Sequence, residues 1–258
     1  MLPMQTKRSR VGGIAGAKGT IRPVTRLKTV AWLLASLLRA LPEWVVVYLP
    51  GDAGVALRQV VYGRRAKHMG SNVVFEPGVQ IEGLEWMTFG DDCWIDKYVV
   101  LLAGPVERGE RVVATKENPA FRGEEGELIL GDRVHLAPHV VVNAHGGVAI
   151  GTDAGVSSGA RIYSLSHHYR NPVDKTDTYE YRFTPKGDPR LQALIAGPVV
   201  TEENAAVGLN AVLLPGSTIR EAAWLGTGAM LRGTIPPGSI AAGNPAEVVG
   251  WRPGREPA

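Results

Sequence analysis

The feature that most constrains this chain is an unbroken series of large side chains spaced six residues apart in its C-terminal third. The series is Thr201, Val207, Leu213, Ile219, Leu225 and Leu231. Four positions after each of the first five stands a small residue: Ala205, Ala211, Ser217, Ala223 and Ala229. An α-helix repeats every 3.6 residues and a strand every two, so neither explains a period of six. Hexapeptide rungs of a parallel β-helix have this period.

The same register extends upstream as four triples of residues spaced six apart. They are Met69, Phe75 and Ile81; Phe89, Ile95 and Leu101; Leu130, Leu136 and Val142; and Ile150, Val156 and Ile162. The first two triples start 20 residues apart, and so do the last two. Three rungs and two extra corner residues make one such coil. We therefore predict a mainly β fold, with a parallel β-helix over residues 67–250 that takes up most of the chain.

Two long segments interrupt the register, residues 103–127 and residues 168–198. Interruptions of this length in a compact domain are usually functional or disordered. The first is rich in charged residues, which favours a solvated flap. The second contains Tyr169, Tyr179 and Phe183, and is too aromatic for a plain linker. We expect it to pack against its own coil or a neighbouring subunit.

The N-terminal segment differs from the rest in charge. Residues 1–42 carry eight Lys or Arg and no Asp or Glu, whereas residues 43–258 carry 20 basic and 25 acidic groups. We expect residues 1–28 to be a disordered basic leader and residues 251–258 a tail. Residues 29–66 are expected to be helical, and either cap the open end of the β-helix or lie on an anionic membrane surface. Arg39 and Pro42 interrupt the apolar run and argue against a membrane span.

Other broad classes fit this composition poorly. The single cysteine, Cys93, falls at a small inward position, so no disulfide framework or cysteine-based zinc site is expected. The basic leader lacks interleaved aromatic residues, and a nucleic-acid partner is not expected. We expect a cytoplasmic location. Contact of residues 1–49 with the inner face of the membrane remains an open alternative.

His167 is the residue best suited to chemistry, because it stands at the mouth of the second interruption. A neutral imidazole can accept a proton from a hydroxyl near physiological pH. A histidine taken alone is more often structural than catalytic. The sequence around His167 is therefore needed to distinguish a catalytic role from a structural one.

Those residues resemble a known family, the hexapeptide-repeat O-acetyltransferases. The resemblance is carried by the GxNAVxLPGxTI stretch at Gly208–Ile219 and by Ala242-Gly243-Asn244-Pro245-Ala246. Upstream, Ile150-Gly151 followed by Ile162-Tyr163-Ser164-Leu165-Ser166-His167 is similar to the galactoside, maltose and colanic-acid acetyltransferase branch. The resemblance covers about residues 69–250.

The resemblance implies a left-handed parallel β-helix that forms a homotrimer, with active sites between subunits. It implies acetyl-CoA as the acyl donor, no metal, and a hydroxyl of a sugar or polysaccharide precursor as acceptor. His167 takes the position of the general base. The residues expected to bind the acceptor are Asn143, His145, Ser166, His168 and Arg170, and those expected to bind the donor are Gly208, Asn210, Gly226, Arg232 and Asn244.

Some positions depart from the family pattern or have a second explanation. Ala206 stands where many relatives have tryptophan, and Glu247 where they have lysine. Arg232 or Arg252 is then the candidate contact for the 3′-phosphate of CoA. For Asn143 a structural explanation is equally good, since asparagine often occurs where the chain turns a corner.

Two alternatives remain open at this stage. The first is a zinc carbonic anhydrase of the kind that also uses this solenoid, since zinc needs three protein ligands and an open position. Its candidate ligands are His135, His139, His145, His167 and His168. The second is a solenoid that binds a glycan without catalysis.

Overall fold

The computed structural model describes Ser36 and residues 40–256, and the chain divides into two units between Glu43 and Trp44. The expected basic leader and most of the expected helix before Pro42 lie outside the described residues. Within the described part of the chain, every helix is too short or too polar to cross a membrane. The β-helix lies in the second unit.

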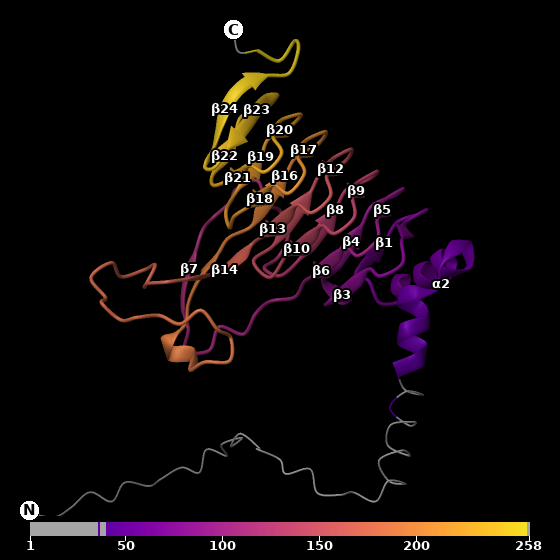
Figure 1. Ribbon diagram of the computed structural model, residues 1–258, viewed down its shortest axis with the longest axis horizontal. Coiled ribbons are helices and arrows are strands. Elements are labelled where there is room, and N and C mark those ends of the chain that lie inside the picture. The colour runs from indigo at the N-terminus through magenta and orange to yellow at the C-terminus, as the bar shows by residue number, and fades with distance from the viewer. Residues whose placement is uncertain (1–35, 37–39, 257–258) are drawn as a thin grey trace, which may run out of the picture. The chain divides into compact units, whose positions relative to one another are not determined.

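Residues 68–243 wind into a parallel β-helix with three faces (Figure 1). The first face contains β1 (His68–Met69), β4 (Met87–Phe89), β8 (Leu128–Leu130), β11 (Val148–Ile150), β16 (Val199–Thr201), β19 (Thr218–Ile219) and β22 (Thr234–Ile235). The second face contains β2 (Val74–Phe75), β5 (Trp94–Ile95), β9 (His135–Leu136), β12 (Gly155–Val156), β17 (Ala206–Val207), β20 (Trp224–Leu225), β23 (Ser239–Gly243) and β24 (Ala246–Trp251).

The third face contains β3 (Gln80–Glu82), β6 (Val100–Leu102), β10 (Val141–Asn143), β13 (Arg161–Tyr163), β18 (Val212–Leu213) and β21 (Met230–Leu231). A short 3₁₀ turn, η1 (Leu84–Trp86), joins the third face to the first in the first coil. At the C-terminal end β24 turns back and pairs antiparallel with β23.

The six-residue register is confirmed as the set of inward positions. Val207, Leu213, Ile219 and Leu225 have no exposed surface, and Cys93 is equally buried. Neighbouring coils align residues 20 apart in the first half, as in Met69 beside Phe89, and residues 18 apart where the series is unbroken. Each inward aliphatic side chain therefore stacks on the equivalent one in the next coil, and full burial of such a side chain stabilises the fold by about 1.5–3 kcal/mol.

The N-terminal end of the coil is covered by helix. Residues 44–48 are helical, and α2 (Gly51–Gly63) follows and packs on β2. The guanidinium of Arg58 is fully buried and donates hydrogen bonds to the carbonyl oxygens of Phe75 (2.7 Å), Leu49 (2.9 Å) and Val46 (3.1 Å). The ring of Tyr62 meets that of Phe75 edge to face at 5.1 Å. One buried cation thus joins both helical segments to the first coil.

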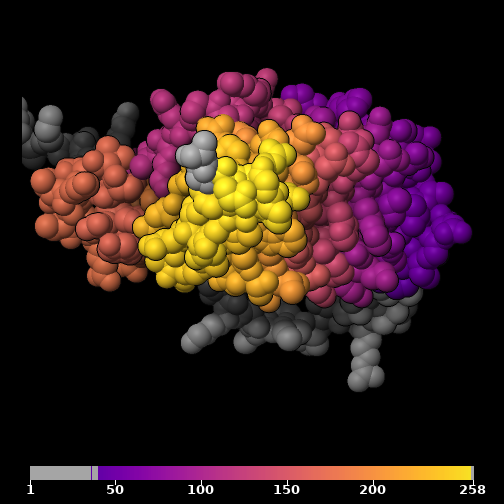
Figure 2. All heavy atoms as spheres, turned by 90° about the horizontal axis from the view of Figure 1, so that it is seen from above, coloured from indigo at the N-terminus to yellow at the C-terminus, as the bar shows by residue number. Residues whose placement is uncertain are grey.

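The two interruptions form a second, smaller sheet beside the coil. This sheet, called here the arm sheet, has the order β14 (Leu165–His168), β15 (Ala193–Ala196) and β7 (Val112–Thr115), and η2 (Pro189–Leu191) leads into β15. β14 and β15 pair antiparallel, and β7 pairs parallel with β15. In Figure 2 the second interruption forms a lobe beside the coil.

The expectation that residues 103–127 form a solvated flap is wrong. Charged residues dominate the composition of this segment, but Val112, Val113 and Ala114 form an apolar stretch long enough to add a strand to β15. The ends of both interruptions also differ from those predicted from the sequence. The first segment leaves the coil at Gly104 and returns at Gly126, where the Gly104 N–H donates to the Gly126 carbonyl oxygen at 2.7 Å. The second leaves at Ser164 and returns at Gly197, where the Gly197 N–H donates to the Ser164 carbonyl oxygen at 2.9 Å.

One inward position generates a prediction about stability. Thr201 is buried between Ile150 and Ile219 in the stack of the first face, and its hydroxyl has no hydrogen-bond partner in the described part of the chain. Thr201→Val removes a buried polar group and keeps its shape, so the free energy of unfolding should rise by about 1–2 kcal/mol. Thermal or denaturant unfolding of the purified variant measures this.

Thr218→Val is the matched control. Thr218 is also buried, but its Oγ1 accepts a hydrogen bond from Asn118 Nδ2 at 2.9 Å. This variant should lose stability. An equal loss of stability in both variants would show that the Thr201 hydroxyl is satisfied in the folded protein.

Candidate active site

Both interruptions leave the coil at the same corner, where the third face turns into the first. We call this the neck corner; it consists of Gly104, Gly126, His145–Gly147, Ser164 and Gly197. The buried Ser164 holds it together, since its Oγ donates to the Asn143 carbonyl oxygen (2.7 Å) and accepts from the Gly146 N–H (2.8 Å). The Ser164 carbonyl oxygen accepts from the Gly197 N–H at 2.9 Å. Two successive coils are thereby fixed where the second interruption begins and ends.

The first interruption returns across the same corner. Asn118 Nδ2 donates to the Pro198 carbonyl oxygen at 3.0 Å, and the Phe121 ring lies against Gly147. A Cβ on Gly147 would stand 2.7 Å from that ring, so the close approach requires glycine. A pocket of about 160 Å³ remains between the two interruptions, lined by Thr115, Phe121, Gly146 and Ala196 among others.

His167 lies on β14, out on the arm sheet, where it pairs with Leu194. Its ring stands 5.2 Å from the ring of Phe183, tilted by 47°. The Nε2 atom is buried and has no hydrogen-bond partner in the described part of the chain. Burial, and after it the positive charge of Arg111, lowers the pKa of His167 below its ordinary value. The imidazole is therefore neutral at physiological pH, with an unused nitrogen.

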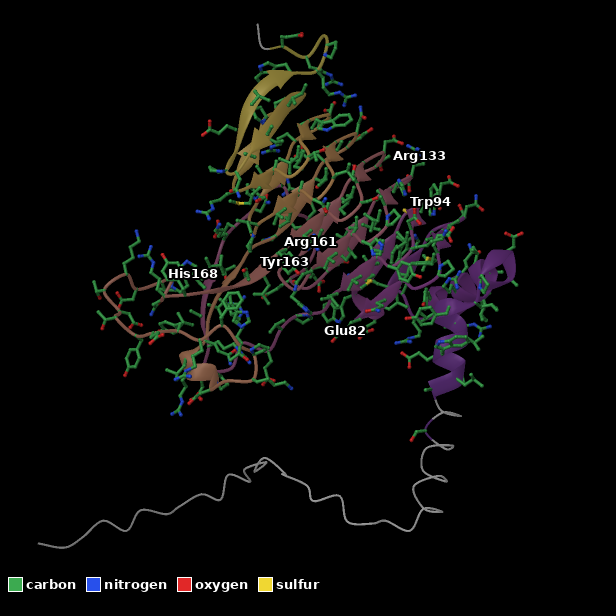
Figure 3. All side chains as sticks on the ribbon, in the orientation of Figure 1. Glu82, Trp94, Arg133, Arg161, Tyr163 and His168 are labelled. Atoms are coloured by element: carbon green, nitrogen blue, oxygen red, sulfur yellow. The ribbon has the colours of Figure 1, made fainter. Side chains whose placement is uncertain are left out.

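The residues expected to bind the acceptor fall into two groups. Asn143 and His145 lie at or beside the neck corner, where His145 Nδ1 is 2.7 Å from the Gly104 carbonyl oxygen. Ser166, His168 and Arg170 lie on the arm, and His168 Nδ1 is 2.8 Å from the Arg170 carbonyl oxygen. In Figure 3 His168 lies out on the arm, whereas Tyr163, the strand partner of Asn143, lies on the coil.

The residues expected to bind the donor are mostly at another corner. Gly208, Asn210 and Gly226 lie where the second face turns into the third, across the whole third face from the neck corner. Gly208 packs so closely on the next coil that a Cβ there would be 2.6 Å from the Gly226 carbonyl carbon. Asn244 lies in the turn between β23 and β24. In a single chain Gly208, Asn210 and Gly226 are therefore apart from the neck corner. Arg232 lies between β21 and β22, where the third face turns into the first, and so is on the same side of the coil as the neck corner.

The two candidate phosphate ligands differ in their surroundings. Arg232 is exposed and makes no hydrogen bond or ion pair with the described residues. Arg252 donates to the Ala222 carbonyl oxygen at 3.0 Å. Arg232 thus has the more available guanidinium.

The five histidines considered as zinc ligands are dispersed. His135 stacks on Trp94 at 4.7 Å and His139 on Tyr98 at 5.3 Å, both on the side of the coil away from the arm. Within the described ranges, no three His, Cys, Asp or Glu side chains gather in a way that could hold a metal ion.

Three residues of the arm were not connected with His167 from the sequence: Arg111, Phe183 and Gln192. Arg111 comes from the other interruption, 56 positions before His167, and only the pairing of β7 with β15 brings it near. Gln192 is completely buried in the arm. The aromatic character of the second interruption was the single available signal for Phe183.

Comparison with known proteins agrees with the family resemblance, although no family model matches the chain. A probable acetyltransferase of Mycobacterium tuberculosis is 30% identical over 139 residues, which is 54% of this chain and 42% of that protein. A putative lipopolysaccharide biosynthesis O-acetyl transferase of Escherichia coli K12 is 26% identical over 124 residues, covering 48% of this chain and 60% of that protein. The chain thus spans about half the length of these two relatives.

A third relative is matched over more of its length. It is the dTDP-4-amino-4,6-dideoxy-D-glucose acyltransferase of Escherichia coli, 22% identical over 186 residues, covering 72% of this chain and 82% of that protein. Among solved structures, an N-acyltransferase of Bacillus cereus in complex with dTDP and coenzyme A superposes with a TM-score of 0.59 at 15% identity, covering 76% of this chain and 89% of that one. The chain is therefore related in sequence to acetyltransferases and has the left-handed parallel β-helix fold predicted for it.

Proposed function

We propose that the protein is a cytoplasmic acyltransferase that moves an acetyl group from acetyl-CoA to a hydroxyl group of a sugar or polysaccharide precursor. The observation that carries this proposal is the state of His167. Its imidazole is half-buried and its pKa is lowered, and the Nε2 atom has no partner among the described residues. A neutral, unoccupied imidazole nitrogen is what a general base for a hydroxyl needs.

In the proposed reaction, His167 Nε2 takes the proton of the acceptor hydroxyl as its oxygen attacks the thioester carbonyl carbon. The new carbon–oxygen bond forms a tetrahedral intermediate, whose oxyanion is stabilised by a backbone N–H. The carbon–sulfur bond then breaks, and the proton on the imidazole passes to the leaving thiolate. Because Nε2 is buried, the arm has to open around the imidazole before the acceptor hydroxyl can reach it.

The class of donor is supported by the fold and its neighbours. The Bacillus cereus N-acyltransferase is solved with coenzyme A bound, and the relatives are acetyl- or acyltransferases. The candidate donor residues are Gly208, Asn210, Gly226 and Asn244, with Arg232 as our choice for the 3′-phosphate because its guanidinium is available.

The acceptor class is supported by two relatives. One is named for lipopolysaccharide O-acetylation and the other for a nucleotide-linked amino sugar. An amine of a nucleotide-linked sugar is therefore the second candidate acceptor, favoured by the third relative and by the N-acyltransferase fold neighbour. Parallel assays with hydroxyl and amino sugars, free and nucleotide-linked, distinguish the two by the product formed. Membrane contact of residues 1–49 stays a prediction.

We further propose that the site is completed between copies of the chain in a homotrimer. His167 and the neck corner lie on one side of the third face, and Gly208, Asn210 and Gly226 lie on the other. A cyclic trimer brings unlike edges of neighbouring copies together, because its interfaces are heterologous. The donor corner of one copy can then face the arm of the next.

The first test removes the base. His167→Ala should lower kcat by about 10²–10⁴-fold, because the proton transfer loses its acceptor. Release of free CoA thiol in the presence of acceptor measures the rate. His68→Ala, which truncates an exposed histidine on β1, is the control and should keep full activity. Near-full turnover by the His167 variant would refute the proposed mechanism.

The second test combines two different variants of the chain in one trimer. Leu209→Trp adds bulk at an exposed position between Gly208 and Asn210 and should block donor binding, whereas His167→Ala removes the base. Each variant alone should have a strongly reduced rate. In a mixed trimer about one site in three joins an intact donor corner to an intact His167, so co-expression should restore activity. The two variants carry different affinity tags, and purification over both columns isolates the mixed trimers. If the mixed trimers are no more active than either variant alone, one chain supplies the whole site.

A further inference from the structure

The first interruption brings a cation to the face of the arm sheet that carries His167. In the arm sheet His167 lies beside Leu194, and Leu194 lies beside Val113. Side chains on a strand alternate between the two faces, and paired residues share a face. Gln192 stands two residues before Leu194 and Arg111 two residues before Val113, each directly before the first residue of its strand. Gln192 has an extended backbone, so the alternation continues through it and places the side chains of Gln192 and Arg111, which are hydrogen-bonded to each other, on the face that carries His167.

Arg111 is fixed in this position by hydrogen bonds. Its Nε donates to Gln192 Oε1 at 2.9 Å, and its NH1 donates to the Glu107 carbonyl oxygen at 3.0 Å. Gln192 is completely buried and is itself held, since its Nε2 donates to the Gly187 carbonyl oxygen at 2.8 Å. The backbone N–H of Val112 donates to the Gln192 carbonyl oxygen at 3.1 Å. The guanidinium is thus anchored in the arm, and it forms no ion pair with any residue that the structure describes.

Among the residues that the structure describes, the other side chains placed around His167 carry no negative charge. β15 presents Leu194, β7 presents Val113, and the loop before η2 presents Phe183. On β14 itself, His168 has the opposite orientation to His167, and its Nδ1 is close to the Arg170 carbonyl oxygen. Arg111 is the charged group that lowers the pKa of His167, in addition to burial.

We propose that Arg111 is a positioning residue for the reaction: anchored by Gln192 on the face of the arm sheet that carries His167, it keeps the imidazole in its neutral, proton-accepting form. This inference rests on the proposed role of His167. It gives residues 103–127 a function, since the pairing of β7 with β15 brings Arg111, the residue directly before β7, to the base. A nearby positive charge disfavours the imidazolium and so favours the neutral base.

The test replaces the charge and follows the base directly. Arg111→Met and Arg111→Gln should both raise the pH at which His167 titrates, measured by NMR of histidine-labelled protein with His167→Ala used to assign the signal. The acidic limb of the pH profile of kcat/KM should move to higher pH in parallel. Near pH 6 the rate should fall about twofold or more while near pH 8 it stays close to the unmodified protein.

Two variants serve as controls. Arg111→Lys keeps the positive charge and should restore the original titration. Arg190→Met also removes an arginine charge from the arm, but Arg190 is paired with Asp188 at 2.6 Å, so His167 should titrate as before.

The inference is overturned if His167 titrates at the same pH with and without the Arg111 charge. It is also overturned if Arg111→Met lowers kcat equally at all pH values. Failure of the proposed function would look different: His167→Ala would remain active, whatever the NMR titration of His167 shows.

Discussion

The parallel ladder between successive coils is the constraint on which the rest of the structure depends. Every inward residue lies over its equivalent in the coil before, as Ile150, Thr201 and Ile219 do on the first face. Any inserted segment must therefore leave and re-enter without changing the register. The two insertions meet this condition at one corner, each closed by a single backbone hydrogen bond, Gly104 to Gly126 and Ser164 to Gly197. Segments inserted at this corner can therefore take on a function without disturbing the register of the coil.

Because both insertions leave from the same corner, they can form one sheet. β7 comes from the first insertion and β14 and β15 from the second, so neither is an independent loop. The arm sheet holds His167 in a half-buried position, with Phe183 against its ring and Arg111 anchored by the buried Gln192. The coil supplies a rigid base, and the arm supplies the electrostatic environment of the imidazole. In our account the chemistry depends on the arm, and substrate binding depends on the corners of the coil.

The sequence predicted the coil well, because a six-residue register is a local signal that repeats many times. The inward positions, the buried Cys93 and the two places where the register breaks could all be read directly. The identity of His167 as candidate base came from its family-like context. The pairing of β7 with β15 could not be read, since four residues of Val112–Thr115 inside a charged segment give no periodic signal. Arg111 and Gln192 were missed for the same reason, because their roles arise from contacts distant in sequence.

The most direct test of the central claim is a crystal or cryo-EM structure of the protein with coenzyme A and a candidate sugar acceptor. Our account predicts the thiol of coenzyme A beside the imidazole of His167, with an acceptor hydroxyl within hydrogen-bond distance of Nε2. Coenzyme A bound away from the arm, with Nε2 of His167 still buried and out of reach of both substrates, would contradict it.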